Sequence, residues 1–341
     1  MAECLAVAGR IDFSNDTSWH SAWKGIADAN RERGDGAWRK GHVVTARSNW
    51  LRAINYYLAA AFPFERSEPL HNSAIADARR CAADFIHRGN PAGEVVGIDW
   101  PGGYPLEGYF LPADAGSAPK PTVICIGEPG RHKEEYLFKA ARHARERGMS
   151  LLAVDLLGAG SADQFEEIVG RRDLERVVAS IMDYLIDRKD VDEARIAIVA
   201  DAWGSSFVAR GIAFDDRFAA AVCDGGIWDL HERAFLRSRM DAVDGNVLHL
   251  GLSRIARNIR CPVLIAAGAR GWLSPTRLRE LHQGLRTDHR EVTLKIFSEE
   301  ETASAQGHTD NPTLANEYIF DWVAAHLSGG ITDNPDPAAP V

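Results

Sequence analysis

Two regions of the chain differ in how their apolar and polar residues alternate. From about Thr17 to about Arg88 the apolar residues recur every three or four positions, as at Val44, Leu51 and Ile54. This spacing is typical of helices that bury one face. The pattern therefore predicts an all-helical N-terminal region, which is also rich in aromatic residues.

From Glu94 onward, short apolar runs alternate with helical segments. The run TVICIG, which begins at Thr122, has the continuous apolar character of a strand buried on both faces. Later runs share this character: SLLAVDL, RIAIVA, FAAAVCDG, CPVLIAAG and VTLKIF. The turn Pro101-Gly102-Gly103 separates VVGIDW from LEGYFLP and predicts an antiparallel hairpin. Strands that alternate with helices predict an α/β fold with a mostly parallel, doubly wound sheet.

The pattern divides the chain into three parts. Residues 1–92 form the predicted helical region, residues 93–328 the α/β core, and residues 329–341 a flexible tail rich in Gly, Pro and Asp. Catalytic groups in sheets of this kind gather at the carboxyl ends of the strands. Candidate chemistry is therefore expected in the turns that follow the strands of the core.

The composition narrows the class of partner. Hydrophobic residues make up 45% of the 341 residues and charged residues 26%, which are ordinary values for a globular protein. The net charge of -9 gives no electrostatic footprint for nucleic acid or for an anionic membrane. We therefore expect a small-molecule substrate, no nucleic acid and no membrane partner.

The cysteines, histidines and glycines indicate the cellular compartment and whether a metal or cofactor is expected. The five cysteines are scattered without CxxC spacing, no basic leader opens the chain, and no run reaches transmembrane length. The histidines lack metal-ligand spacing, and GAGSA after SLLAVDL lacks the full glycine fingerprint of a dinucleotide site. These features predict a cytoplasmic protein with no metal and no cofactor.

The stretch IAIVADAWGSSFVARG, residues 196–211, has the outline of a nucleophile elbow. In such an elbow a sharp turn from a strand to a helix lifts a reactive side chain to the top of the sheet. The position at the apex is occupied by Ala202, which has no proton to give and no lone pair to attack a carbonyl. The chain as printed is therefore not expected to form an acyl-enzyme.

Several signatures together resemble those of an α/β-hydrolase. They are GEPGRHKEE after TVICIG, DLLGAGSA after SLLAVDL, the elbow itself, the closing segment GHTDNPTLANEYIFDWV, and VTARSNWLRAINYY ahead of the sheet. From about Trp19 to about Leu327 the chain is similar to the branch that contains 2,6-dihydroxypseudooxynicotine hydrolase and the fungal yellowish-green-pigment chain-shortening hydrolases, and more distantly to FrsA-like esterases. The resemblance implies cleavage of an ester or of a carbon–carbon bond next to a ketone, with residues 1–92 as a helical cap.

The resemblance also assigns roles in the elbow and in the last loop. The family pattern Gly-x-Ser-x-Gly maps onto residues 200–204, so that Ala202 stands at the nucleophile position and Gly204 is retained. The histidine of the triad corresponds to His308, in the loop before the final helix.

The triad acid is less clearly marked. The turn after CPVLIAAG reads GARGWLSP and has no carboxylate, whereas CDGGIWDLHE at the preceding strand offers Asp224, Asp229 and Glu232. An acid needs only to orient and stabilise the imidazole, so its place in the chain can move. We favour Asp229 over Asp224. The sequence is equally compatible with a structural role for either carboxylate, as a helix cap or in a loop turn.

The oxyanion hole is expected to use two backbone N–H groups. One belongs to Trp203, after the nucleophile position. The second belongs to Glu128 or Gly130, because the proline between them has no N–H. We interpret Lys133 and Glu134, in the HKEE that follows, as structural.

Aromatic residues are expected to shape the substrate pocket. Trp228 and Trp272 lie in turns where the family builds its site, and Tyr57 belongs to the helical cap. A pocket lined in this way suits a flat ring or a polyketide.

The alanine at the elbow leaves two classes of function open. In the first, the chain is a serine hydrolase whose serine was replaced by Ala202 through engineering. In the second, the alanine is natural, and His308 acts as a general base in a cyclisation or a dehydration, or the pocket only binds a ligand. Related proteins imply a homodimer built partly by the cap.

Overall fold

The computed structural model describes residues 2–101, 104–127, 131–156, 175–202, 204–225, 258–288 and 291–328. The eight described strands belong to a mixed sheet. The chain divides into two compact units. The first comprises Met1–Ser117, Cys125–Arg145 and Ser150–Asp173, and the second comprises Ala118–Ile124, Glu146–Met149 and Leu174–Val341. No helix of the described residues is both long and apolar enough to cross a membrane.

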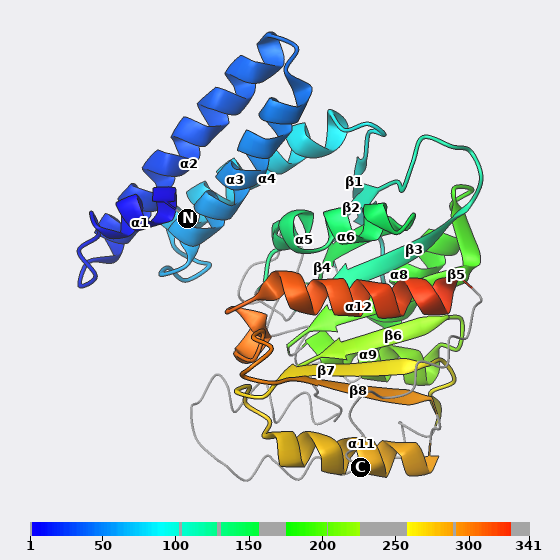
Figure 1. The fold of residues 1–341 in the computed structure, drawn as a ribbon. Helices are drawn as coiled ribbons and strands as arrows, with labels where there is room; N and C mark the ends of the chain where they lie inside the picture. Colours follow the sequence, from blue (N-terminus) through cyan, green and yellow to red (C-terminus); the bar gives the residue numbers. More distant parts are fainter. Residues whose placement is uncertain are drawn as a thin grey trace. The chain divides into compact units, whose positions relative to one another are not determined.

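Helices dominate the N-terminal part of the first unit (Figure 1). They are α1 (Ala2–Ala8), α2 (Asp16–Arg39), α3 (Val43–Ala61) and α4 (Pro69–His87). Helix α2 begins where the side chain of Asn15 accepts hydrogen bonds from the backbone N–H groups of Thr17 and Ser18. Helices α2 and α3 pack so closely that a side chain at Gly34 would meet the ring of Trp50. The predicted helical region is confirmed.

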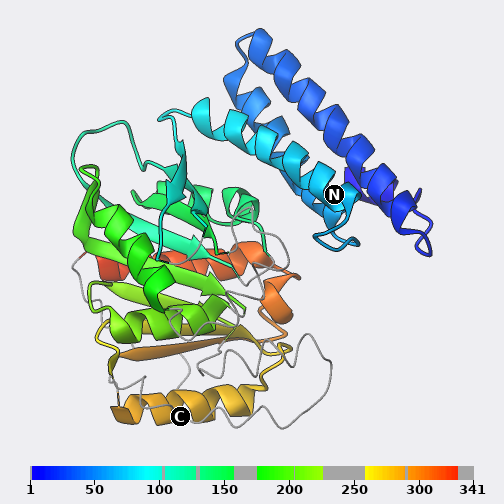
Figure 2. The same ribbon diagram turned by 180° about the vertical axis from the view of Figure 1, so that it is seen from behind.

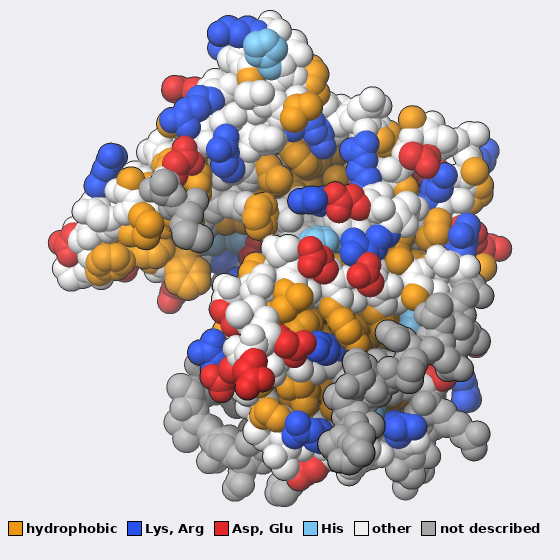
Figure 3. All heavy atoms as spheres, viewed as in Figure 1, with side chains coloured by type: hydrophobic (Ala, Val, Ile, Leu, Met, Phe, Trp, Pro, Cys, Tyr) orange, Lys and Arg blue, Asp and Glu red, His pale blue; other side chains and the backbone are white. Residues whose placement is uncertain are grey.

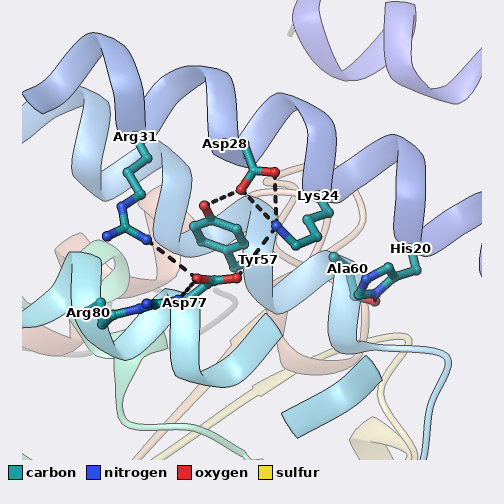
Figure 4. Close-up of polar contacts among 8 residues, drawn as sticks. All are labelled: His20, Lys24, Asp28, Arg31, Tyr57, Ala60, Asp77 and Arg80. Atoms are coloured by element: carbon teal, nitrogen blue, oxygen red, sulfur yellow. Dashed lines mark hydrogen bonds and ion pairs between the residues drawn. The ribbon is translucent and has the colours of Figure 1, made fainter. Parts of the chain in front are cut away.

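A polar network joins α2, α3 and α4 (Figure 4). The carboxylate of Asp77 on α4 is 9% exposed and lies 3.6 Å from Nζ of Lys24 and 3.4 Å from Nη1 of Arg31, both on α2. Lys24 also pairs with Asp28 at 2.9 Å, and the hydroxyl of Tyr57 on α3 donates to Asp28 at 2.6 Å. The three helices are thus connected by charged groups as well as by apolar contacts.

The strands of the first unit are antiparallel. Strand β2 pairs with β1 on one side and with β4 on the other. The bounds of these strands are β1 (Glu94–Ile98), β2 (Leu106–Leu111) and β4 (Ser150–Asp155). Helix α5 (Glu134–Lys139) belongs to the same unit. Two further elements are divided between the units: β3 (Lys120–Ile126) and α6 (Ala141–Glu146).

The second unit is a layer of parallel strands between helices. Its elements are α8 (Glu175–Ile186), β5 (Val191–Asp201), α9 (Gly204–Phe214), β6 (Ala220–Asp224), β7 (Val263–Gly268), α11 (Pro275–Asp288), β8 (Val292–Phe297), the 3-10 turn η2 (Gln306–His308) and α12 (Pro312–Leu327). Strands β5, β6, β7 and β8 pair in that order, all parallel.

Helices cover both faces of these parallel strands. Helix α12 lies in front of them in Figure 1, and α8 and α9 lie in front in the reverse view of Figure 2. The strand residues from Ile196 to Ala200 are buried, as a strand between two helical layers requires. Helix α9 approaches α8 closely at Gly211, where a Cβ would meet the side chain of Val178.

The structure confirms the predicted α/β fold and the antiparallel pairing of VVGIDW with LEGYFLP. The turn residues Gly102 and Gly103 lie outside the described residues. The proposed division at residues 92 and 93, and the tail at residues 329–341, stay predictions.

Candidate active site

The turn between β5 and α9 holds Ala202 in an unusual backbone conformation. Its φ is 46°, in the left-handed region that costs a residue with a side chain about 1–2 kcal/mol. Helix α9 follows at once, and the N–H of Ser205 donates to the carbonyl of Ala202 at 3.2 Å. A left-handed residue between a strand and a helix is the backbone geometry of a nucleophile elbow, which here presents a methyl group.

Strand β6 ends beside this turn. Asp201 and Asp224 are register partners across β5 and β6. Gly225 follows with a φ of 116°, and a Cβ at that position would lie 3.0 Å from the Cα of Ala202. Glycine is required there for its backbone conformation and for the close approach, which holds Asp224 next to the elbow.

Ser205 holds the two strand ends together. It is fully buried, and its hydroxyl lies 3.1 Å from the carbonyl oxygen of Asp224 and 3.3 Å from that of Ala200. A hydroxyl that donates to backbone carbonyls inside the core has no role as a nucleophile. Ser205 therefore does not replace the missing serine in this arrangement.

His308 is buried and forms hydrogen bonds through both ring nitrogens. Nε2 lies 2.7 Å from Oδ1 of Asp224, and Nδ1 lies 2.6 Å from the carbonyl oxygen of Ala303. The ring of Phe297 packs edge-on against the imidazole, with centroids 5.0 Å apart. Because both neighbours are acceptors, the ring satisfies them best with a proton on each nitrogen.

The environment of His308 changes its protonation. Burial disfavours the imidazolium, but the Asp224 carboxylate and the Ala303 carbonyl outweigh that penalty and raise the pKa of His308 to about 9. At neutral pH the pair is therefore an imidazolium bonded to a carboxylate. Such a pair can donate a proton from the ring and accept one at the carboxylate.

The loop that carries His308 is strained. Its left-handed residues are Thr302, Ala303, Gly307 and His308, with φ between 55° and 69°. Non-glycine residues persist in this region only where surrounding contacts fix them, and they cluster at functional sites.

Asp310 supplies contacts that fix this loop. Its Oδ2 accepts from the backbone N–H of Ser304 at 3.0 Å and from the Ser304 hydroxyl at 3.1 Å, and its Oδ1 accepts from the N–H of Ala305 at 3.1 Å. These bonds outweigh burial and lower the pKa of Asp310 to about 2. Asp310 is thus a positioning residue for His308.

The end of β7 supports the same loop. Gly268 faces the backbone of Ser304 so closely that any Cβ would collide with it. Arg270, in the turn where many hydrolases carry their acid, donates from its backbone N–H to the Ser304 carbonyl at 2.8 Å and from Nε to the Ser304 hydroxyl at 3.0 Å. The turn after β7 therefore holds the histidine loop with a guanidinium and a glycine instead of supplying a carboxylate.

The structure describes only part of the predicted site. Ala202 lies beside Gly225, and the neighbouring Asp224 contacts His308, so Asp224 connects the histidine to the strand end next to the elbow. The other predictions lie outside the described residues: Asp229, Trp203, Glu128 and Trp228. The preference for Asp229 as the acid stays a prediction, and Asp224, its alternative, is the carboxylate in contact with the histidine.

The two remaining aromatic predictions fall in different surroundings. Trp272 is partly exposed in the turn before α11, and its backbone N–H donates to Oε1 of Gln306 at 3.0 Å. Tyr57 is fully buried among the N-terminal helices, with its hydroxyl on Asp28. These contacts give Tyr57 a packing role, and its assignment to a substrate pocket stays a prediction.

Sequence reasoning did not single out Gly225 or Asp310. The available signals were the pair of glycines directly after the β6 run and the carboxylate two residues after His308 in GHTDN. Among the described residues no group of three or more His, Cys, Asp or Glu is placed to hold a metal ion.

Parallel strands with helices on both faces, a left-handed elbow and a histidine paired with a carboxylate define the protein class as an α/β-hydrolase. A solved structure of 2,6-dihydroxy-pseudo-oxynicotine hydrolase has the same fold, with a TM-score of 0.73, 18% identity and complete coverage of both chains.

The sequence comparisons are more specific. Residues 17–255 match the FrsA-like esterase family, and the chain belongs to that family. Hydrolyase poxO of Penicillium oxalicum is 27% identical over 80% of this chain and 67% of its own length. The 20-hydroxy-prefusarin hydrolase FUS2 of Gibberella moniliformis is 29% identical over 70% of this chain and 59% of its own length. The chain thus spans about two thirds or less of the length of these relatives.

Proposed function

We propose that this chain is the scaffold of a hydrolase that cleaves an ester, or a carbon–carbon bond next to a ketone, in an aromatic or polyketide substrate. In this proposal Ala202 occupies the place of a serine nucleophile. The observation that carries it is the left-handed φ of 46° at Ala202, beside the strand end whose Asp224 is bonded to His308. Natural selection has little reason to keep such strain at a position with no chemistry.

A serine at position 202 would complete a reaction cycle. His308 first gives its Nε2 proton to Asp224, and Nε2 then turns from Asp224 to the serine hydroxyl. The hydroxyl attacks the carbonyl while the neutral imidazole takes its proton. The imidazolium then protonates the leaving carbanion or alkoxide, and a water activated by His308 releases the acyl group. The fungal relatives, which include a hydrolase named for 20-hydroxy-prefusarin, support a small organic molecule as the substrate.

The experiment compares the printed chain with its Ala202→Ser and Ala202→Gly variants on aryl esters and aromatic 1,3-diketones. Loss of a nucleophile costs on the order of a million-fold in turnover, so the serine variant should gain several orders of magnitude. The glycine variant is the matched control, because it changes the same position without adding a hydroxyl. A serine variant no faster than the glycine variant rejects the hydrolase proposal, as does a gain that survives His308→Ala.

The bonding of His308 favours a second candidate if the alanine is natural. With both ring nitrogens engaged and a pKa of about 9, His308 is an acid at neutral pH, and Asp224 is the adjacent base. Such a pair suits a cyclisation or a dehydration, with the imidazolium protonating the departing oxygen and the carboxylate removing a proton. Elimination by the printed chain that Asp224→Asn abolishes would support this candidate over the first.

We also propose that the protein is a cytoplasmic homodimer. All five cysteines are free, which suits a reducing compartment. Hydrophobic side chains gather over α1 and the adjoining end of α2 (Figure 3). Leu5 on α1, Phe13 between α1 and α2, and Phe62 at the end of α3 are exposed. A second copy of the chain would cover them. Light scattering should give about twice the mass of the 37.4 kDa chain, and the mass of one chain rejects the dimer.

A further inference from the structure

A second group of polar side chains lies within the first unit. It consists of Arg66 between α3 and α4, His71 and Arg79 on α4, and His132 just before α5. We call these four residues the Arg66 cluster. None of them has a role in the proposed reaction.

Each residue of the Arg66 cluster buries a polar atom that finds no hydrogen-bond partner among the described residues. The atoms are Nη2 of Arg66, Nδ1 of His71, Nε of Arg79 and Nδ1 of His132. Buried polar atoms are nearly always bonded, and leaving one unbonded costs about 1–3 kcal/mol. Four such atoms on neighbouring side chains leave hydrogen bonds to be made by a polar group that the described residues do not supply.

The members of the cluster lie close together. The rings of His71 and His132 have their centroids 5.5 Å apart, and Nδ1 of His132 lies 4.0 Å from Oδ2 of Asp155 at the end of β4. Arg66 and Arg79 both act on the pKa of His71 and of His132. Arg66 and Arg79 also keep part of their surface exposed.

The two imidazoles are neutral at physiological pH. Burial is the main cause that lowers the pKa of His71, and the two arginines lower it further. Burial, with the same arginines, lowers the pKa of His132 to about 3, against the opposing pull of Glu134. A neutral imidazole carries one N–H, and each arginine nitrogen can only donate. The cluster itself is therefore chiefly a set of donors, beside the Glu134 carboxylate, whose Oε2 also finds no partner among the described residues.

The charges around the cluster indicate whether the acceptor bound by these donors is an anion or a neutral group. The described carboxylates at this place outnumber the cations: they are Glu68, Glu107, Glu134 and Asp155, against Arg66, Arg79 and Lys133. Lys133 lies 3.0 Å from Glu107 and 3.3 Å from Glu134, whose Oε1 also accepts from the Tyr109 hydroxyl at 2.5 Å. An added anion would bring one more negative charge to a place where carboxylates already outnumber cations.

We propose that the Arg66 cluster binds the neutral carbonyl oxygen of a small molecule, a ketone, ester or amide, through donors from Arg66 and the two imidazoles. Such an oxygen accepts hydrogen bonds and brings no charge. The proposal does not depend on the reaction proposed for position 202, because binding is measured with the printed chain and no turnover is required.

The test follows the imidazole nitrogens of the printed chain by ¹⁵N NMR during titration with acetophenone. We expect the Nδ1 signals of His71 and His132 to move together as the ketone binds, while those of His282 and His326 stay in place. Benzoate, which has the same ring and a charged group, should bind more weakly. Signals of His71 and His132 that do not move, or a higher affinity for benzoate, overturn the proposal.

Two variants locate the contact. Arg66→Gln should weaken acetophenone binding by about tenfold, since it removes a charged donor. Arg80→Gln, on the exposed side of α4, is the matched control and should leave the affinity unchanged. Equal affinity in both variants rejects the cluster as the site. If Arg66→Gln does not fold, the titration of the unsubstituted chain still decides, because it needs no substitution.

Discussion

The pairing of His308 with Asp224 makes the stability of the protein depend on pH in a defined direction. A histidine whose pKa is raised from 6.5 to about 9 in the folded state contributes stability that is fully present below pH 6.5 and is lost as the pH rises through 9. Each pH unit in this window is worth about 1.4 kcal/mol, so the contribution approaches roughly 3 kcal/mol. The perturbation that tests it is Asp224→Asn, which keeps the size and the acceptor oxygen and removes the charge.

The assay is urea unfolding followed by tryptophan fluorescence at pH 6.5 and at pH 9. The free energy of unfolding should fall by roughly 3 kcal/mol between these values in the unsubstituted chain and by much less in Asp224→Asn. NMR titration should place the pKa of His308 near 9 and find it lowered toward 6.5 in the variant. Asp216→Asn, at an exposed carboxylate, is the matched control and should behave like the unsubstituted chain. An equal fall in the Asp224→Asn variant refutes the assigned cause.

Three further substitutions test the backbone of the site. Ala202→Gly should stabilise the fold by about 1 kcal/mol, because glycine relieves the left-handed strain, and an unchanged melting temperature contradicts this. Gly225→Ala should destabilise it by about 1–3 kcal/mol in urea unfolding, since the added Cβ meets the elbow; a neutral result means the strands can separate. Asp310→Ala should lower the pKa of His308 measured by NMR and loosen its loop, and an unaltered pKa removes the positioning role.

Long, regular patterns were predictable from the sequence. The helical spacing around Leu51 and the continuous apolar runs at Ile124 and Ile198 specify helices and buried strands because burial acts on every residue of such a segment. The division of the chain into units was less accessible. Strands β1, β2 and β4 cluster with the N-terminal helices, and which elements cluster together depends on contacts between distant segments that no local pattern records.

Site residues could be predicted where a sequence motif marks them. They could not where their role depends on contacts between segments that are far apart in the chain. The elbow of Ala202 and the loop of His308 follow from strand-to-helix and loop-to-helix signatures. The carboxylate in contact with the histidine was harder to predict. Asp224 and Asp229 both stand near the end of the same apolar run, and the contact of Asp224 with His308 depends on how distant segments pack. The Arg66 cluster was inaccessible for the same reason, since α4 and the segment before α5 meet only in three dimensions.

The network around Asp77 (Figure 4) fixes how the N-terminal helices are aligned. Apolar helix faces tolerate sliding, because one leucine or alanine can take the place of another a turn away. A displacement of α4 by one turn, about 5.4 Å, would carry the buried carboxylate of Asp77 away from the partly exposed Lys24 and Arg31 and leave it with Arg80 of its own helix. The network thus favours one register of the three helices. A variant such as Asp77→Leu would keep the helices but remove the charged contacts that favour this register.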